Sequence, residues 1–133
     1  MYLLDTNVCI VFLKGKNDSL RQRIDVVPSN QICLCSIVAS ELLYGAAKSQ
    51  RKQETLARLN EFLACFRIYD FDLASAHRFG EIRAELNRQG LPIGPYDLQI
   101  AAIALANQLV LVTHNVTEFS RVPDLKCVDW EMP

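Results

Sequence analysis

The sequence lacks several features that define whole classes of protein. It has no excess of charge of one sign, because 14 basic and 15 acidic residues leave a formal net charge of −1. This balance disfavours the strongly basic type of nucleic-acid binder. It has no long hydrophobic run either, since the longest wholly apolar stretch, Ile100 to Ala106, is far too short to cross a bilayer. We therefore expect neither a membrane protein nor a simple basic binder.

Patterns typical of zinc sites, disulfide frameworks and export are also missing. The two histidines form no His-x-x-x-His pair, and the first ten residues, MYLLDTNVCI, carry no basic segment of a secretory or transit peptide. The cysteines are odd in number and lack the tight pairs of a zinc ribbon; they are Cys9, Cys33, Cys35, Cys65 and Cys127. We expect a cytoplasmic protein whose cysteines are free thiols in the core.

Half of the residues are apolar, which is enough for one core of ordinary size and predicts a single domain over residues 1–133. Short apolar segments predict strands at Tyr2–Leu4, Ile32–Cys35, Arg67–Asp70, Leu109–Thr113 and Leu125–Val128. Helical spacing predicts helices at Val8–Leu13, Ile37–Ala47, Ser49–Cys65 and Tyr96–Asn107, with a further surface helix between residues 15 and 30. Another long helix is expected to be capped by Asp72 and to run to Gln89. Strands that alternate with helices indicate an α/β domain with a mostly parallel sheet.

Acidic residues stand where such a sheet would collect its functional groups. Asp5 follows the first strand, Asp97 lies in the first turn of an apolar helix, and Glu118 lies in a predicted loop after the strand Leu109–Thr113. In an open parallel sheet, ligands bind at the carboxyl ends of the strands, next to helix N-termini. The sequence therefore predicts that these carboxylates lie near one another.

Glu41 is a fourth candidate and lies in the middle of a helix. It shares a stripe with Val38, Leu42 and Gly45, at spacings of three and four residues, so its carboxylate is expected on the side that faces protein. A half-buried carboxylate needs a partner. No cationic residue is three or four positions away, so the partner must come from elsewhere in the fold, and a metal ion is one candidate.

Each acid also has a plain structural explanation. Asp5 and Asp97 would stabilise helix N-termini, Glu118 would be a solvated acid, and Glu41 would pair with a remote arginine. Their joint placement favours a cation site, because crowded carboxylates repel unless protons or cations intervene. All-oxygen ligation suits Mg²⁺ or Mn²⁺ rather than zinc. Two such ions would change the formal charge from −1 to +3 where phosphate binds.

Four segments, taken in order, resemble the PIN-domain nucleases and most closely the VapC toxins of toxin-antitoxin pairs. They are Leu3-Leu4-Asp5-Thr6-Asn7, Ser40-Glu41-Leu42-Leu43-Tyr44-Gly45-Ala46, Gly94-Pro95-Tyr96-Asp97-Leu98-Gln99-Ile100-Ala101-Ala102 and Thr113-His114-Asn115-Val116-Thr117-Glu118-Phe119. Each segment alone is weakly specific, but the four in this order and spacing are specific. One departure is His114, where many relatives have a second asparagine.

The resemblance implies a three-layer α/β/α sandwich with a parallel sheet of about five strands, a homodimer, and a VapB-like antitoxin that neutralises the toxin. It also implies Mg²⁺-dependent endoribonuclease activity, in which a metal-activated water hydrolyses RNA. By the same resemblance the metal ligands are Asp5, Glu41, Asp97 and Glu118, and Thr6 and Asn115 support them by hydrogen bonds.

Three other functions share part of this pattern. A phosphatase of the haloacid dehalogenase type needs a second Asp two residues after the first, and Asn7 stands there instead. A catalytically silent module would keep the acids as structure and only bind RNA or protein. An RNA-processing nuclease of the same fold, outside a toxin-antitoxin pair, would share the chemistry. The sequence identifies neither the RNA that is cut nor the number of ions.

Overall fold

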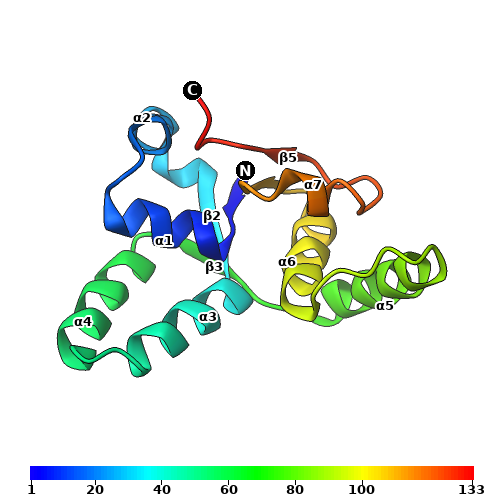
Figure 1. Cartoon of the computed structure of the whole chain (residues 1–133), viewed down its shortest axis with the longest axis horizontal. Coiled ribbons are helices and arrows are strands. Elements are labelled where there is room, and N and C mark those ends of the chain that lie inside the picture. Colours follow the sequence, from blue (N-terminus) through cyan, green and yellow to red (C-terminus); the bar gives the residue numbers. More distant parts are fainter.

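The computed structural model describes all 133 residues, and its backbone forms one five-stranded parallel sheet covered by helices (Figure 1). The strands are β1 (Tyr2–Leu4), β2 (Ile32–Cys35), β3 (Arg67–Tyr69), β4 (Val110–Val112) and β5 (Cys127–Val128). They run in the order β3-β2-β1-β4-β5, and every neighbouring pair is parallel. The predicted α/β class and the parallel sheet are confirmed.

Helices fill the connections between these strands. They are α1 (Thr6–Lys14), α2 (Asp18–Val26), α3 (Ser36–Ala47), α4 (Lys52–Leu63), α5 (Leu73–Arg88), α6 (Pro95–Ala106) and α7 (Val116–Phe119), with a 3-10 turn, η1 (Ser29–Gln31). Crossovers between parallel strands are nearly always right-handed. Because the chain first moves from β1 outward to β3 and then returns past β1 to β4, α1 to α4 lie on one face and α5 to α7 on the other. Figure 1 shows these groups at left and right.

The core consists of 28 buried apolar residues around β1, β2, β4 and α6. Helix α6 contributes Leu98 and the run from Ile100 to Ala104, which agrees with its apolar character on nearly every face. Burial raises the pKa of the Cys33 and Cys35 thiols to about 11, so these cysteines behave as small apolar side chains. Cys65 is exposed, and the expectation of a core position was wrong for it. No helix is both long and apolar enough to span a membrane.

Some predicted boundaries differ from the structure. Glu118 lies in the short helix α7 rather than in a loop, because one helical turn follows directly after Asn115. The last strand contains only Cys127 and Val128, since β4 pairs with these two positions alone. Helix α4 begins at Lys52 rather than at Ser49, because Ser49 accepts a hydrogen bond from the Arg51 amide in a turn before the helix.

Candidate active site

The site lies where the sheet changes its direction of winding. Strands β1 and β4 are neighbours in the sheet, although β2 and β3 come between them in the sequence. Loops after two such strands diverge to opposite faces and leave a crevice at their carboxyl ends. Asp5 follows β1 and Thr113 follows β4, so these residues face each other across this crevice. The topology therefore places Asp5 at the centre of the site.

Asp5 is buried and fully hydrogen-bonded. Its Oδ1 accepts from the Val8 amide at 2.9 Å, which caps α1, and its Oδ2 accepts from the Thr113 hydroxyl at 2.5 Å. Burial raises the pKa of this carboxyl, the two hydrogen bonds lower it, and the negative charge of Glu41 raises it further; the first effect dominates. Asp5 thus caps a helix, as its plain interpretation required, and also presents its carboxylate to the site.

Glu41 reaches the site from α3. The Thr6 hydroxyl, in the first turn of α1, donates a hydrogen bond to Glu41 Oε1 at 2.7 Å. This bond supplies the partner that the sequence required from elsewhere in the fold. Because Thr6 follows Asp5 directly, it fixes the Glu41 carboxylate relative to Asp5, and the second Glu41 oxygen accepts no hydrogen bond from protein.

Asp97 and Glu118 complete the acidic set from the other face of the sheet. The pKa of Asp97 is raised to about 6, first by burial and then by the charges of Glu118, Asp5 and Glu41. The side-chain amide of Asn115 donates a hydrogen bond to Glu118 Oε2 at 2.8 Å. The structure therefore brings the charges of Asp5, Glu41 and Glu118 within range of Asp97. The two supporting hydrogen bonds that the resemblance implies, from Thr6 and Asn115, are present.

The four acids surround the crevice loosely rather than touching. No three of them bring oxygens within 4.8 Å of one another. Their like charges repel. Hydrogen bonds from Thr6 and Asn115 hold one oxygen of Glu41 and one oxygen of Glu118. Carboxylate oxygens that remain free to move inward suit Mg²⁺, which takes one or two carboxylates and keeps several waters. The donor set fits such an ion.

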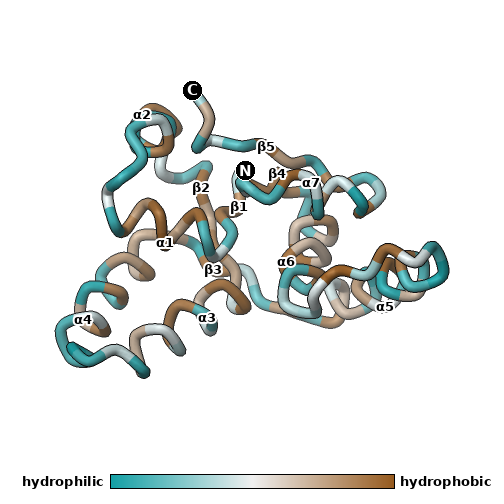
Figure 2. Tube along the Cα trace, viewed as in Figure 1, coloured by the Kyte–Doolittle hydropathy of each residue, from teal (hydrophilic) through white to brown (hydrophobic).

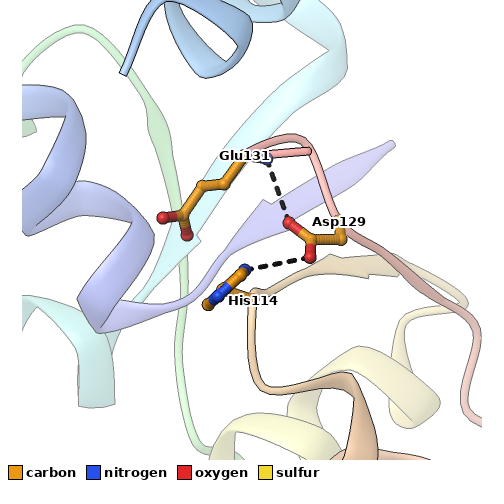
Figure 3. A group of neighbouring side chains, drawn as sticks. All are labelled: His114, Asp129 and Glu131. Carbon is orange, nitrogen blue, oxygen red and sulfur yellow. Dashed lines mark hydrogen bonds and ion pairs between the residues drawn. The ribbon is translucent and has the colours of Figure 1, made fainter. Parts of the chain in front are cut away.

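Sequence reasoning missed three residues beside this crevice. The Thr113 hydroxyl accepts a hydrogen bond from the backbone amide of Asn115 at 3.0 Å while it donates one to Asp5. It therefore links the segment after β4 to the segment after β1. Asp129, directly after β5, lies 3.0 Å from His114 Nδ1, and Glu131 completes the group in Figure 3. A polar residue directly after an apolar strand was the available signal for Thr113 and Asp129. No local signal pointed to Glu131.

Comparison with known proteins agrees with this geometry. The PIN domain family model matches residues 2–125. The chain belongs to the PIN domain family. The tRNA(fMet)-specific endonuclease VapC of Shigella flexneri is 43% identical over 129 residues, which cover 97% of both chains. Ribonuclease VapC2 of Rickettsia felis is 39% identical and covers 98% of both. The predicted membership is confirmed.

Solved structures show the same fold at full length. The DNA-bound VapBC complex of Salmonella typhimurium matches with a TM-score of 0.92 and 41% identity, covering 97% of both chains. VapBC2 of Rickettsia felis, bound to a DNA fragment from its promoter, matches with a TM-score of 0.90 and 38% identity, covering 97% of this chain and 98% of that one. The three-layer arrangement predicted from the sequence is therefore confirmed.

Proposed function

We propose that this PIN domain is a Mg²⁺-dependent endoribonuclease toxin, with Mn²⁺ as a substitute ion. Its metal ligands are the four acids of the crevice, Asp5, Glu41, Asp97 and Glu118. The observation that carries the proposal is the gathering of these four carboxylates at one end of the sheet, held by Thr113, Thr6 and Asn115. Burial and the three other negative charges raise the pKa of Asp97 there, which supports it. A group of carboxylates that repel in this way is stabilised by a cation.

The chain's own residues would orient this chemistry. A divalent ion bound by carboxylates supplies a water nucleophile at neutral pH and stabilises charge on the phosphate. The Thr113 hydroxyl and the Val8 amide hold Asp5 at a fixed angle. Thr6 fixes one Glu41 oxygen and leaves the other free, and Asn115 does the same for Glu118. The bonds from Thr6 and Asn115 thus each leave one carboxylate oxygen available as a ligand.

Cleavage assays in Mg²⁺ and in chelator test this function. Two relatives, 43% and 42% identical, are tRNA(fMet)-specific endonucleases, so we propose structured tRNA as the substrate class and tRNA(fMet) as the first RNA to assay. The purified chain should cleave in Mg²⁺ and stop in chelator, and Asp5→Asn and Asp97→Asn should remove cleavage without unfolding. Near-normal cleavage by either variant would show that the site is wrong.

The same assays separate the rival functions. A silent binding module would bind RNA or protein but never cleave, whereas a processing nuclease would cleave without arresting growth when expressed alone. The phosphatase alternative lacks its second acid, because Asn7, at the edge of the crevice, occupies the position where that acid is needed. Growth arrest that Asp97→Asn relieves would favour the toxin over the processing enzyme.

We further propose that a VapB-like antitoxin binds a groove that leads to Glu41. The groove, of about 380 Å³, lies between α1, α3 and α4, and its apolar wall includes Ile10, Leu42 and Leu59. Figure 2 shows brown, apolar segments of these helices along their facing sides. Glu41 lines the same groove. An apolar helix carrying an arginine would fill the wall and pair with the acid in bidentate fashion.

Assembly and location follow from the same proposal. Large apolar side chains remain exposed on Tyr44, Leu73 and Tyr96, at 67%, 74% and 63%, and we propose that a homodimer covers part of this surface. Because its proposed substrate is RNA and its proposed partner is an antitoxin, we propose that the protein acts in the cytoplasm. Light scattering of the purified chain, with and without the antitoxin, would measure the assembly, and a monomer at high concentration would contradict the dimer.

A further inference from the structure

A second group of possible ligands lies beside the crevice, at the end of the chain. The segment after β5 is held firmly, because Trp130 is 3% exposed and its ring lies 4.9 Å from the ring of Tyr2. The Asn17 amide also donates to the Glu131 carbonyl at 3.3 Å. Asp129 and Glu131, on either side of this tryptophan, therefore have fixed backbone positions.

Asp129 orients the imidazole of His114. Asp129 Oδ2 lies 3.0 Å from His114 Nδ1, and Asp129 Oδ1 accepts from the Glu131 amide at 3.0 Å. A carboxylate that accepts from Nδ1 leaves the Nε2 lone pair free. Metal-binding histidines are usually held in this way, with the second ring nitrogen donating to a carboxylate.

His114 and Glu131 both line one pocket of about 260 Å³, together with Asp5, Asn7 and Asn115, whereas Asp129 does not line it. Glu131 Oε2 is buried, with less than 1 Å² exposed, and has no hydrogen-bond partner. Figure 3 shows its carboxylate turned away from Asp129. No Lys or Arg lines this pocket. A buried carboxylate oxygen without a partner is costly, and a cation would satisfy it.

We propose that His114 and Glu131 bind a divalent first-row transition ion in this pocket, with Asp129 as the residue that orients His114. One ligand atom from each of these residues lies within 4.8 Å of the others. A tetrahedral ion at about 2.0–2.2 Å from its ligands needs them ~3.4 Å apart, so the two side chains would move toward each other when the ion binds. An imidazole nitrogen with a carboxylate favours zinc over Mg²⁺. The imidazole thus gives this site a different ion preference from that of the four acids, although Asp5 borders both.

Zn²⁺ binding to the metal-free full-length chain tests the proposal without RNA. In excess Mg²⁺, equilibrium dialysis should find one more tightly bound Zn²⁺ in wild type than in His114→Asn, which keeps a polar side chain near Asp129 but is a poor ligand. Glu131→Gln should weaken this Zn²⁺ at least tenfold. His77→Asn is the matched control, because His77 is the other histidine and is exposed on α5, and it should leave binding unchanged.

A spectroscopic reading separates this site from the acid cluster. Added Zn²⁺ should shift the imidazole NMR signals of His114 and leave those of His77 in place, both in wild type and in Asp97→Asn. If His114→Asn and Glu131→Gln, both folded by circular dichroism, bind Zn²⁺ as wild type does, the site does not exist. Loss of the ion in Asp97→Asn alone would assign it to the acid cluster and also overturn the proposal. Neither result depends on whether the protein cleaves RNA.

Discussion

The Thr113 hydroxyl donates a buried 2.5 Å hydrogen bond to Asp5, a residue 108 positions earlier in the chain. This bond joins the ends of β4 and β1, the two central strands of the site. Because the same hydroxyl accepts from the Asn115 amide, it also sets the start of the segment that carries Glu118. The uncharged side chain of Thr113 therefore fixes Asp5 relative to the segment that carries Glu118.

Thr113→Val should damage both stability and metal binding. The change leaves Asp5 Oδ2 and the Asn115 amide without this partner, and unsatisfied buried groups cost about 1–3 kcal/mol. Mutation of a residue that orients a metal ligand typically lowers the affinity for the metal about 10–100-fold. Cleavage at low Mg²⁺ should therefore fall by at least tenfold. Urea unfolding and Mg²⁺ titration measure the two effects. Thr113→Ser keeps the hydroxyl and should stay close to wild type; equal losses in both variants would contradict this role.

The stability of the metal-free protein should depend on pH through Asp97. Its folded pKa of about 6 lies above the ordinary value of 3.8, so folding disfavours the charged form. The free energy of unfolding should therefore fall as pH rises from about 4 to about 6 and level off above. After allowance for solvent screening, the loss is about 1–2 kcal/mol. Asp97→Asn should flatten this slope in chelator, and an unchanged slope would show that Asp97 does not carry the repulsion.

Divalent metal should reverse this destabilisation. At free Mg²⁺ or Mn²⁺ near 100 times its dissociation constant, binding to the folded state adds about 2.7 kcal/mol. For a domain of this size the melting temperature should rise by several degrees. Calorimetry in chelator and in metal measures the gain, and Asp97→Asn should show a much smaller one. Equal gains in the two proteins would mean that the acids do not share a cation.

Gly45→Trp should block the antitoxin groove without disturbing the fold. Gly45 lines the groove, and a Cβ added there meets no atom within 4 Å. The indole would occupy the apolar wall, so the affinity for the antitoxin should fall at least tenfold. Gly80→Trp is the matched control, because Gly80 is equally open but lies on α5 outside the groove. Calorimetric titration with the antitoxin compares them, and equal binding by both variants would place the antitoxin elsewhere.

The sequence by itself determined the alternation of strands and helices, because each element carries its own apolar period and its own caps. Asp72, for example, caps α5 as expected. It also determined the four acids, since Asp5 and Asp97 stand next to element boundaries that local patterns predict.

Only the tertiary structure decided which of these residues meet. The bond from Thr113 to Asp5 requires β4 to lie beside β1, and strand order depends on crossover packing rather than on any local pattern. Glu131 reaches the pocket because Trp130 is buried against Tyr2. Such contacts join residues more than 100 positions apart, and the free energy that selects them comes from burying the shared core, which no short segment contains.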